Sequence, residues 1–335
     1  MDNLTHSLTG FALARTGLDR FCPRAVWLLL LSANAPDGDI VFALQGPFRY
    51  FEAHRGYSHC LVCLPLLALL CVALVSLISR QRLPWWRAWF LCVIGIASHL
   101  LLDLTNSYGI RLSLPFSSRW YHLDLNSLYD IWILAALMLA AIAPVLVWMV
   151  NREIGDRKSS SGRGLAIAAL LFFVAFDFAR LVLHNRTVAQ LNSLLYDNAP
   201  ALQTAALPDS FNPLRWTGII ETNDAFLRLE TSSLAQPDPS SAETFYKPAL
   251  TPSIEAAKTV DPFRYFVYFA RFPVWSEQPV LSGATQNTRV DLSDLRFGAP
   301  GRGSFHCIGL VKDSGQLTGK WFTFGTGAEF GLAGK

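Results

Sequence analysis

The sequence predicts a polytopic α-helical membrane protein with a C-terminal, mainly antiparallel β domain outside the membrane. Hydrophobic residues make up 52% and charged residues 16% of its 335 residues, and the mean hydropathy is +0.30. Several windows of about 20 residues carry no charged side chain, which is the length needed to cross a bilayer core. After about residue 185, short apolar runs separated by Gly, Asp and Ser turns replace these long windows.

The long apolar windows are interpreted as membrane spans at Leu61–Ser79, Trp86–Leu104, Leu128–Val150 and Leu165–Leu183. Ala25–Leu44 is a fifth candidate that is interrupted at Asn34–Asp39. A lipid-exposed break would leave backbone groups unpaired in hydrocarbon, so this break is expected to face protein or a wet cavity. Leu4–Thr16 is expected to form a short helix that cannot span the membrane alone.

The basic residues of the loops predict the orientation of these spans. One loop carries Arg80, Arg82 and Arg87 without acids, and the loop before the last span is also rich in Arg and Lys. Both loops are expected to be cytoplasmic. Alternation then places residues 45–59, residues 105–127 and the chain after about residue 185 on the outer side. We therefore expect a helical membrane domain over residues 1–185 and an outer, β-rich domain over residues 186–335.

Within the C-terminal domain, strand-like runs are expected at Trp216–Glu221, Phe226–Leu229, Phe263–Phe272, Thr288–Leu295, Phe305–Val311 and Lys320–Phe324. The membrane-proximal residues Asn185–Leu202 are expected to continue as a polar-faced helix, and Ser232–Ala242 as a surface loop. No motif in this domain identifies a protein partner.

Charge and cysteine content exclude two other classes of protein. The net charge of +3 is too small to indicate a nucleic-acid partner, and the six cysteines form no pattern typical of a disulfide framework. The lipid bilayer is the partner that the composition predicts.

Ionisable residues at membrane depth are costly and mark function by default. His99 and Asp103 are four residues apart on an otherwise apolar helix, so they share one face that must point inward. This is also the spacing at which one helix offers two ligands to one metal. A hydrogen bond between the two that ties helices together would give the same pattern.

Three further motifs add to this pair. Asp37 and Asp39 follow a proline break, as in turns that bind one cation or bridge two. His54 and His59 come just before a membrane helix, and His6 lies in the first short helix. The predicted topology brings all of them to the outer half of the membrane domain. The combined set is His6, Asp37, Asp39, His54, His59, His99 and Asp103.

Imidazole and carboxylate ligands without clustered thiolates favour zinc, with manganese or iron as alternatives. Seven candidate residues are more than the three protein ligands of one catalytic zinc. Some of them are therefore expected to hold the ligands in place without binding metal, or a second metal is present. Arg55, Arg111 and Arg119 lie on the predicted outer side and suit an anionic group. The alternative interpretation is that these arginines only anchor the protein at the membrane–water interface.

These motifs resemble the YdjM/YbcI-type inner-membrane metal-dependent hydrolases. The resemblance covers residues 1–130 through Asp2-x-x-Thr5-His6-x-Leu8-x-Gly10, Asn34-x-Pro36-Asp37-x-Asp39, His54-Arg55-Gly56-x-Ser58-His59, Ser98-His99-x-x-x-Asp103, Tyr108-Gly109 and Pro115-Phe116-Ser117. One departure is Ser58, where Thr is expected before the histidine. The resemblance implies a multi-pass protein of the bacterial inner membrane and metal-site roles for the seven His and Asp residues.

We therefore expect a membrane-bound hydrolase in which metal-activated water attacks an ester, such as a lipid phosphoester, near the outer membrane face. Asp37, His59 and Arg55 are expected to be catalytic, and Arg55, Arg111 and Arg119 to bind the substrate. Two other functions fit the same residues. One is a metal-ion-handling or transport protein, and the other is a structural or regulatory membrane protein whose C-terminal domain binds a partner.

Overall fold

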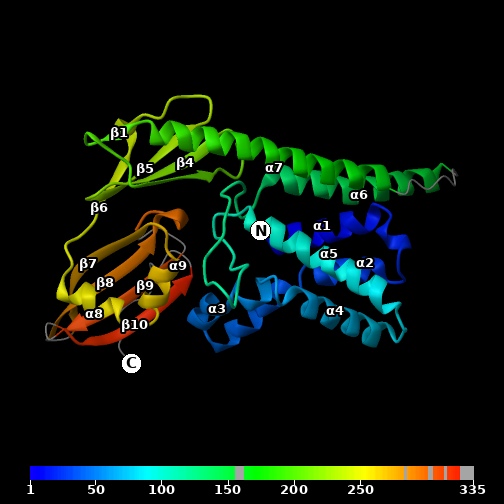
Figure 1. Cartoon of the computed structure of the whole chain (residues 1–335), viewed down its shortest axis with the longest axis horizontal. Coiled ribbons are helices and arrows are strands. Elements are labelled where there is room, and N and C mark those ends of the chain that lie inside the picture. The colour runs from blue at the N-terminus through cyan, green and yellow to red at the C-terminus, as the bar shows by residue number, and fades with distance from the viewer. Residues whose placement is uncertain (155–161, 283–284, 301–304, 313–314, 325–335) are drawn as a thin grey trace. The chain divides into compact units, whose positions relative to one another are not determined.

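A computed structural model describes residues 1–154, 162–282, 285–300, 305–312 and 315–324. The chain divides into two compact units (Figure 1). The helical unit comprises Met1–Val41, Ala53–Asn185 and Pro208–Arg215, and the strand-rich unit comprises Phe42–Glu52, Arg186–Leu207 and Trp216–Lys335.

The predicted helical N-terminal region is confirmed. Its α-helices are α1 (Asn3–Arg15), α2 (Ala25–Ser32), α3 (Pro47–Ala53), α4 (Leu64–Ser79), α5 (Trp85–Leu104), α6 (Ile131–Glu153) and α7 (Arg163–Asn192). Short 3-10 helices lie between them at η1 (Leu18–Arg20), η2 (Pro36–Gln45) and η3 (Tyr57–His59).

Three helices in the described residues, α5, α6 and α7, are individually long and apolar enough to cross a membrane. Two bent pairs meet the same criterion together: α2 with η2, at 50°, and Pro47–His59 with α4, at 92°. The break predicted at Asn34–Asp39 is the bend between α2 and η2. The helix of the span predicted at Leu61–Ser79 begins at Leu64, after a sharp turn of the chain, and α4 has 16 residues.

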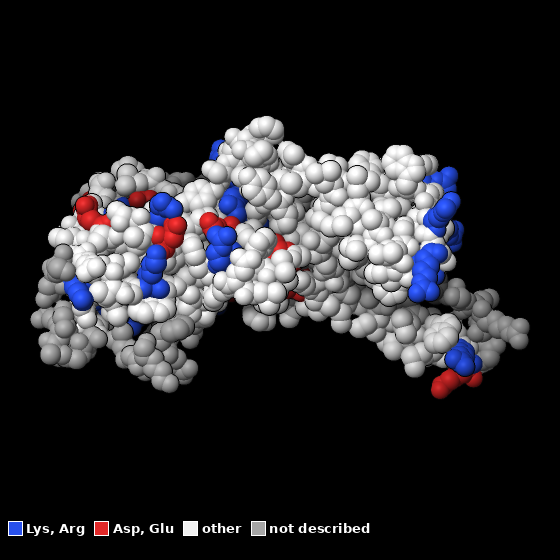
Figure 2. All heavy atoms as spheres, turned by 90° about the horizontal axis from the view of Figure 1, so that it is seen from below, with Lys and Arg blue, Asp and Glu red and all other residues white. Residues whose placement is uncertain are grey.

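The basic residues of the helical unit gather where several of its connections lie together. The α1–α2 and α4–α5 connections, the end of α6 and the start of α7 lie at one end of this unit (Figure 1). Lys and Arg gather at that end, whereas the face of the helical unit seen in Figure 2 is otherwise almost free of charge. This distribution agrees with the Arg-rich loops that were predicted to share one side of the membrane.

Two glycines allow α1, α2 and α5 to pack closely. A Cβ on Gly10 would lie 2.7 Å from the carbonyl oxygen of Leu29, and a Cβ on Gly95 would lie 2.0 Å from Ser32 Oγ. Any larger side chain would therefore push these helices apart. The close approach brings the end of α2 against the middle of α5, where His99 lies.

The strand-rich unit contains two four-stranded sheets with orders β3-β4-β5-β6 and β10-β9-β8-β7. Their strands are β3 (Gln203–Pro208), β4 (Arg215–Glu221), β5 (Ala225–Ser232), β6 (Glu243–Tyr246), β7 (Pro273–Ser282), β8 (Thr285–Asp294), β9 (Phe305–Lys312) and β10 (Leu317–Phe324). The shorter elements are β1 (Leu195–Tyr196), β2 (Ala199–Pro200), η4 (Pro239–Ser241), α8 (Pro252–Lys258), α9 (Phe263–Phe269) and η5 (Leu295–Phe297). The predicted antiparallel β-rich region is confirmed.

Two local predictions in this unit were wrong. Phe263–Phe269 forms α9 and not a strand, because Phe263, Phe266 and Phe269 recur every three residues and all are buried on one helical face. The helix expected through Leu202 ends at Asn192. A hairpin, β1–β2, follows it, and its loop residues Asp197 and Asn198 adopt φ of 51° and 64°.

One short helix joins the hydrophobic core of the strand-rich unit. Phe51 of α3 is fully buried and its ring stacks on Phe322 of β10, with centroids 4.3 Å apart. Phe269 and Tyr265 of α9 contact the Phe51 ring edge-on, with ring centroids 5.0 and 5.2 Å away. Residues 42–52 therefore belong to this unit, although they lie in sequence between Asp39 and His54.

Candidate metal centre

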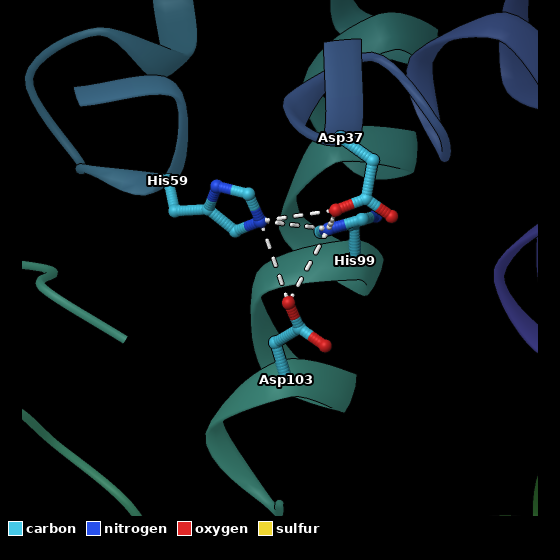
Figure 3. A group of neighbouring side chains, drawn as sticks. All are labelled: Asp37, His59, His99 and Asp103. Carbon is cyan, nitrogen blue, oxygen red and sulfur yellow. Dashed lines mark hydrogen bonds and ion pairs between the residues drawn. The ribbon is translucent and has the colours of Figure 1, made fainter. Parts of the chain in front are cut away.

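Four side chains of the helical unit converge on one point (Figure 3). His99 and Asp103 come from α5, His59 from η3 and Asp37 from the first turn of η2. His59 Nε2 lies 3.1 Å from His99 Nε2, 3.5 Å from Asp37 Oδ1 and 3.4 Å from Asp103 Oδ2. His99 Nε2 lies 3.6 Å from Asp37 Oδ1 and 3.5 Å from Asp103 Oδ2.

The local sequence explains how these groups meet. The i,i+4 spacing places His99 and Asp103 on one face of α5, as predicted. Three residues separate the end of α2 from Pro36, which begins η2, and the bend between the two helices turns Asp37 toward that face. The bend before α4 carries His59 inward, and its imidazole is fully buried.

Hydrogen bonds fix which ring nitrogens face the centre. His99 Nδ1 lies 2.7 Å from the carbonyl oxygen of Ala33, which can only accept, so Nδ1 carries the proton. Ser58 Oγ donates to Asp39 Oδ2 at 2.8 Å and accepts from His59 Nδ1 at 2.9 Å. In the neutral imidazoles both Nε2 atoms therefore present lone pairs, as metal-bound histidines do.

The donor set fits a small divalent cation. Metal–ligand bonds of about 2.0–2.1 Å in a tetrahedron give ligand–ligand separations of about 3.3 Å, close to the five separations above. Two lone pairs and two carboxylate oxygens this close together would repel one another without a cation or an added proton. Asp103 Oδ2 is buried and, among the described residues, has no hydrogen-bond partner. This buried His/Asp group could therefore hold a metal ion.

A second group of possible ligands shares Asp37 with the first. Asp37, Asp39 and His54 offer ligand atoms within 4.8 Å of one another. His54 Nδ1 lies 2.9 Å from Asp39 Oδ1. Asp39 Oδ2 accepts from the Arg55 backbone amide and from Ser58 Oγ. Asp39 thus connects the second group to the residues that orient His59.

His6 lies beside the first group and is not one of its four members. Its ring stacks on that of His99 with centroids 3.8 Å apart, and its Nε2 lies 3.4 Å from Asp103 Oδ1. His6 is 1% exposed, and neither ring nitrogen has a hydrogen-bond partner among the described residues. The structure thus gathers all seven predicted His and Asp residues into one region, in which Asp37 and His54 are half-buried and the other five are buried.

Arg55 is buried and contacts a ligand candidate. It is 3% exposed, and its Nη2 donates to Asp103 Oδ1 at 2.8 Å while Nη1 donates to the Gly109 carbonyl at 3.3 Å. Its guanidinium carbon lies 4.8 Å from the centroid of the Tyr108 ring. The Met1 amino group also contacts Asp103 Oδ1. These contacts fix the orientation of Asp103.

The other two predicted substrate-binding arginines lie in the segment after α5. Arg111 is half-buried and stacks over Trp120, and its backbone amide donates to the carbonyl of Arg55. Arg119 is exposed beside Tyr121. Arg111 is therefore tied to the loop that carries Arg55.

Sequence reasoning assigned no role to Ser58 or to the Ala33 carbonyl, which orient the two histidines. A hydroxyl residue directly before His59 was the available signal for Ser58. The Ala33 carbonyl had no such signal, because any residue type supplies a backbone oxygen.

Replacing Ser58 with Ala is expected to weaken metal binding about 10–100-fold, the usual effect of removing a group that orients a metal-bound histidine. The variant loses the bridge between His59 Nδ1 and Asp39 Oδ2. Ser58→Thr keeps the hydroxyl and is the matched control, expected to bind as wild type does. Competition titration with a fluorescent zinc chelator measures both variants, and equal affinity of Ser58→Ala and wild type would contradict the orienting role.

Comparison with known proteins agrees with this architecture. The family described as "YdjM inner membrane protein" matches residues 1–187. The chain is also similar to the "Uncharacterized protein YfhP" of Bacillus subtilis (strain 168). They share 23% identity over 235 residues, which cover 68% of this chain and 67% of YfhP. No solved structure matches significantly. With more than half of its length matched and helices able to cross a membrane, the chain belongs to the YdjM family of inner membrane proteins.

Proposed function

We propose that this protein is a membrane-bound, metal-dependent hydrolase with its centre at His59, His99, Asp103 and Asp37. One observation carries the proposal: two imidazole Nε2 atoms and two carboxylate oxygens face one another at 3.1–3.6 Å in a buried site. Zinc is the first choice for this nitrogen and oxygen donor set, with manganese or iron as alternatives.

The exposure of the four residues suggests different roles for them. His59, His99 and Asp103 are at most 1% exposed and match the two imidazoles and one carboxylate of many catalytic zinc sites. The Asp37 side chain is 14% exposed, so the three buried residues would hold the metal and Asp37 would accept a proton from water. A bound divalent metal supplies Lewis acidity and activates water at neutral pH. Arg55 keeps Asp103 in place instead of binding substrate.

The proposed substrate is an ester with an anionic group, such as a phosphoester. Arg111 and Arg119, in the segment after α5, would bind it, whereas Arg55 is engaged with Asp103. We place the centre and the C-terminal domain, residues 186–335, on the outer side of the membrane. The connections that carry Arg lie together at one end of the helical unit, and loops rich in Arg and Lys usually face the cytoplasm. This supports the proposed orientation.

Cysteine labelling tests the orientation. A Ser240→Cys variant, exposed in the strand-rich unit, is expected to react with a membrane-impermeant maleimide in intact spheroplasts. The same substitution at Arg82, in the α4–α5 connection, is expected to react only after lysis. Labelling with the opposite pattern would reverse the orientation.

The hydrolase proposal is tested by turnover of methyl 4-nitrophenyl phosphate and of 4-nitrophenyl esters by purified protein. Activity is expected to disappear after chelation with EDTA and to return with zinc, manganese or iron. Activity that survives complete metal removal, or no activity with any of these metals, would contradict the proposal.

A metal-handling function is the second candidate, and the second ligand group favours it. Two adjacent ligand groups that share Asp37 would also suit transfer of an ion from one group to the other. Metal uptake by proteoliposomes without hydrolytic turnover would support this function in place of hydrolysis.

A further inference from the structure

The helical unit has a groove along α1 that no residue of the candidate centre lines. Two adjoining cavities of about 360 and 250 Å³ share Phe11, Ala141 and Val145. The first is also lined by Leu8, Leu30 and Ile142. Ser7 and Arg15 mark the two ends of the groove on α1. They are eight positions apart on the α-helix, so the groove is about 12 Å long.

One end of the groove is lined by a sequence neighbour of the metal-centre residues. Ser7 directly follows His6, whose ring stacks on His99. Ser7 Oγ donates to Asn34 Oδ1 at 3.2 Å, and Asn34 lies three residues before Asp37. The Ser7 end of the groove is therefore one residue along the chain from His6, and it contacts Asn34, three residues before Asp37.

The lining favours a hydrocarbon occupant. Apart from Ser7, the residues that line the first cavity are apolar, and they belong to α1, α2 and α6. α6 can cross a membrane alone, and Ile142 and Val145 are 44% and 52% exposed. This end of the groove carries no charge and opens to the bilayer. Lipid chains therefore surround it.

We propose that this groove binds an acyl chain of the substrate, so that the enzyme acts on a membrane lipid. The inference rests on the proposed hydrolase function and adds the substrate class. The lipid would place its ester group at the metal centre and its chain along Leu8, Phe11 and Val145 toward Arg15.

The test fills the groove by Ala141→Trp, with Leu139→Trp as the matched control. Leu139 lies two residues away on α6, about 200° around the helix, and is 62% exposed. Binding is read without turnover, by crosslinking to a phosphatidylglycerol with a diazirine on its acyl chain, in nanodiscs. Turnover is compared for hexadecyl and methyl 4-nitrophenyl phosphate, which share a head group and differ in the chain.

Ala141→Trp is expected to lower groove crosslinking and to raise KM for the hexadecyl ester about 10-fold or more, the effect of several lost methylene contacts. It is expected to leave the methyl ester rate and the metal content unchanged. Identical crosslinking and KM in the two Trp variants would overturn the groove proposal, even in an active enzyme. Groove-dependent crosslinking without hydrolysis of either ester would overturn the hydrolase proposal, and with it the claim that the bound chain belongs to a substrate.

Discussion

An Asp37→Asn variant is expected to lose about 100-fold or more of the hydrolytic rate, the contribution of a positioned general base, while still binding metal. Asparagine keeps the size of the side chain but cannot take up a proton at this position. The three buried residues, His59, His99 and Asp103, remain to hold the ion. Single-turnover rates and metal content measured on the same preparation separate the two effects.

The matched control for this prediction is Asp19→Asn, which removes an exposed carboxylate from η1 in the same unit. Its rate is expected to equal that of wild type. Loss of metal together with activity in Asp37→Asn would make Asp37 an essential ligand and contradict its role as the base. An unchanged rate would contradict any catalytic role for Asp37.

The largest stability effect is expected from Phe51→Ala. Phe51 is fully buried and contacts Phe322, Phe269 and Tyr265 of the strand-rich unit. Truncation of a buried Phe costs about 3–5 kcal/mol of unfolding free energy, because apolar burial is lost and a cavity remains. Tyr265 also donates a hydrogen bond from its hydroxyl to the carbonyl of Glu52 at 3.0 Å, which holds α3 against α9.

Leu44→Ala is the control for this measurement, since Leu44 belongs to the same unit and is 87% exposed. Surface truncations of this kind change stability by about 0.5 kcal/mol or less. Denaturant titration in detergent, followed by tryptophan fluorescence, compares the two variants with wild type. Equal midpoints for Phe51→Ala and Leu44→Ala would contradict the placement of α3 in this core.

The sequence predicted the parts of the fold and the site that depend on local spacing. The i,i+4 pair of His99 and Asp103 fixes one helical face whatever the tertiary structure. Pro36 disfavours continuation of the preceding helix, so the bend that presents Asp37 was also predictable. The charge distribution of the loops predicted which helix ends lie together.

Other features depend on contacts between residues far apart in the sequence. Phe51 contacts Phe269 and Phe322 across more than 200 residues, and no local pattern assigns it to the C-terminal core. The aromatic content of Phe263–Phe269 suggested a strand, but packing on one face selected a helix. Arg55 carried a charge suited to a substrate, and only its contact with Asp103 shows that the charge is already paired.

Metal content tests the central claim most directly. Wild-type protein purified in detergent and reconstituted with zinc, manganese or iron is measured by elemental mass spectrometry beside His99→Ala and Asp103→Ala. Our interpretation predicts about one equivalent of metal, or two if the group of Asp37, Asp39 and His54 is also filled, with loss from the first group in both variants. Wild-type protein that binds no metal under any of these conditions would contradict it. The buried histidines and aspartates would then be ties between helices, with one of the facing imidazoles protonated.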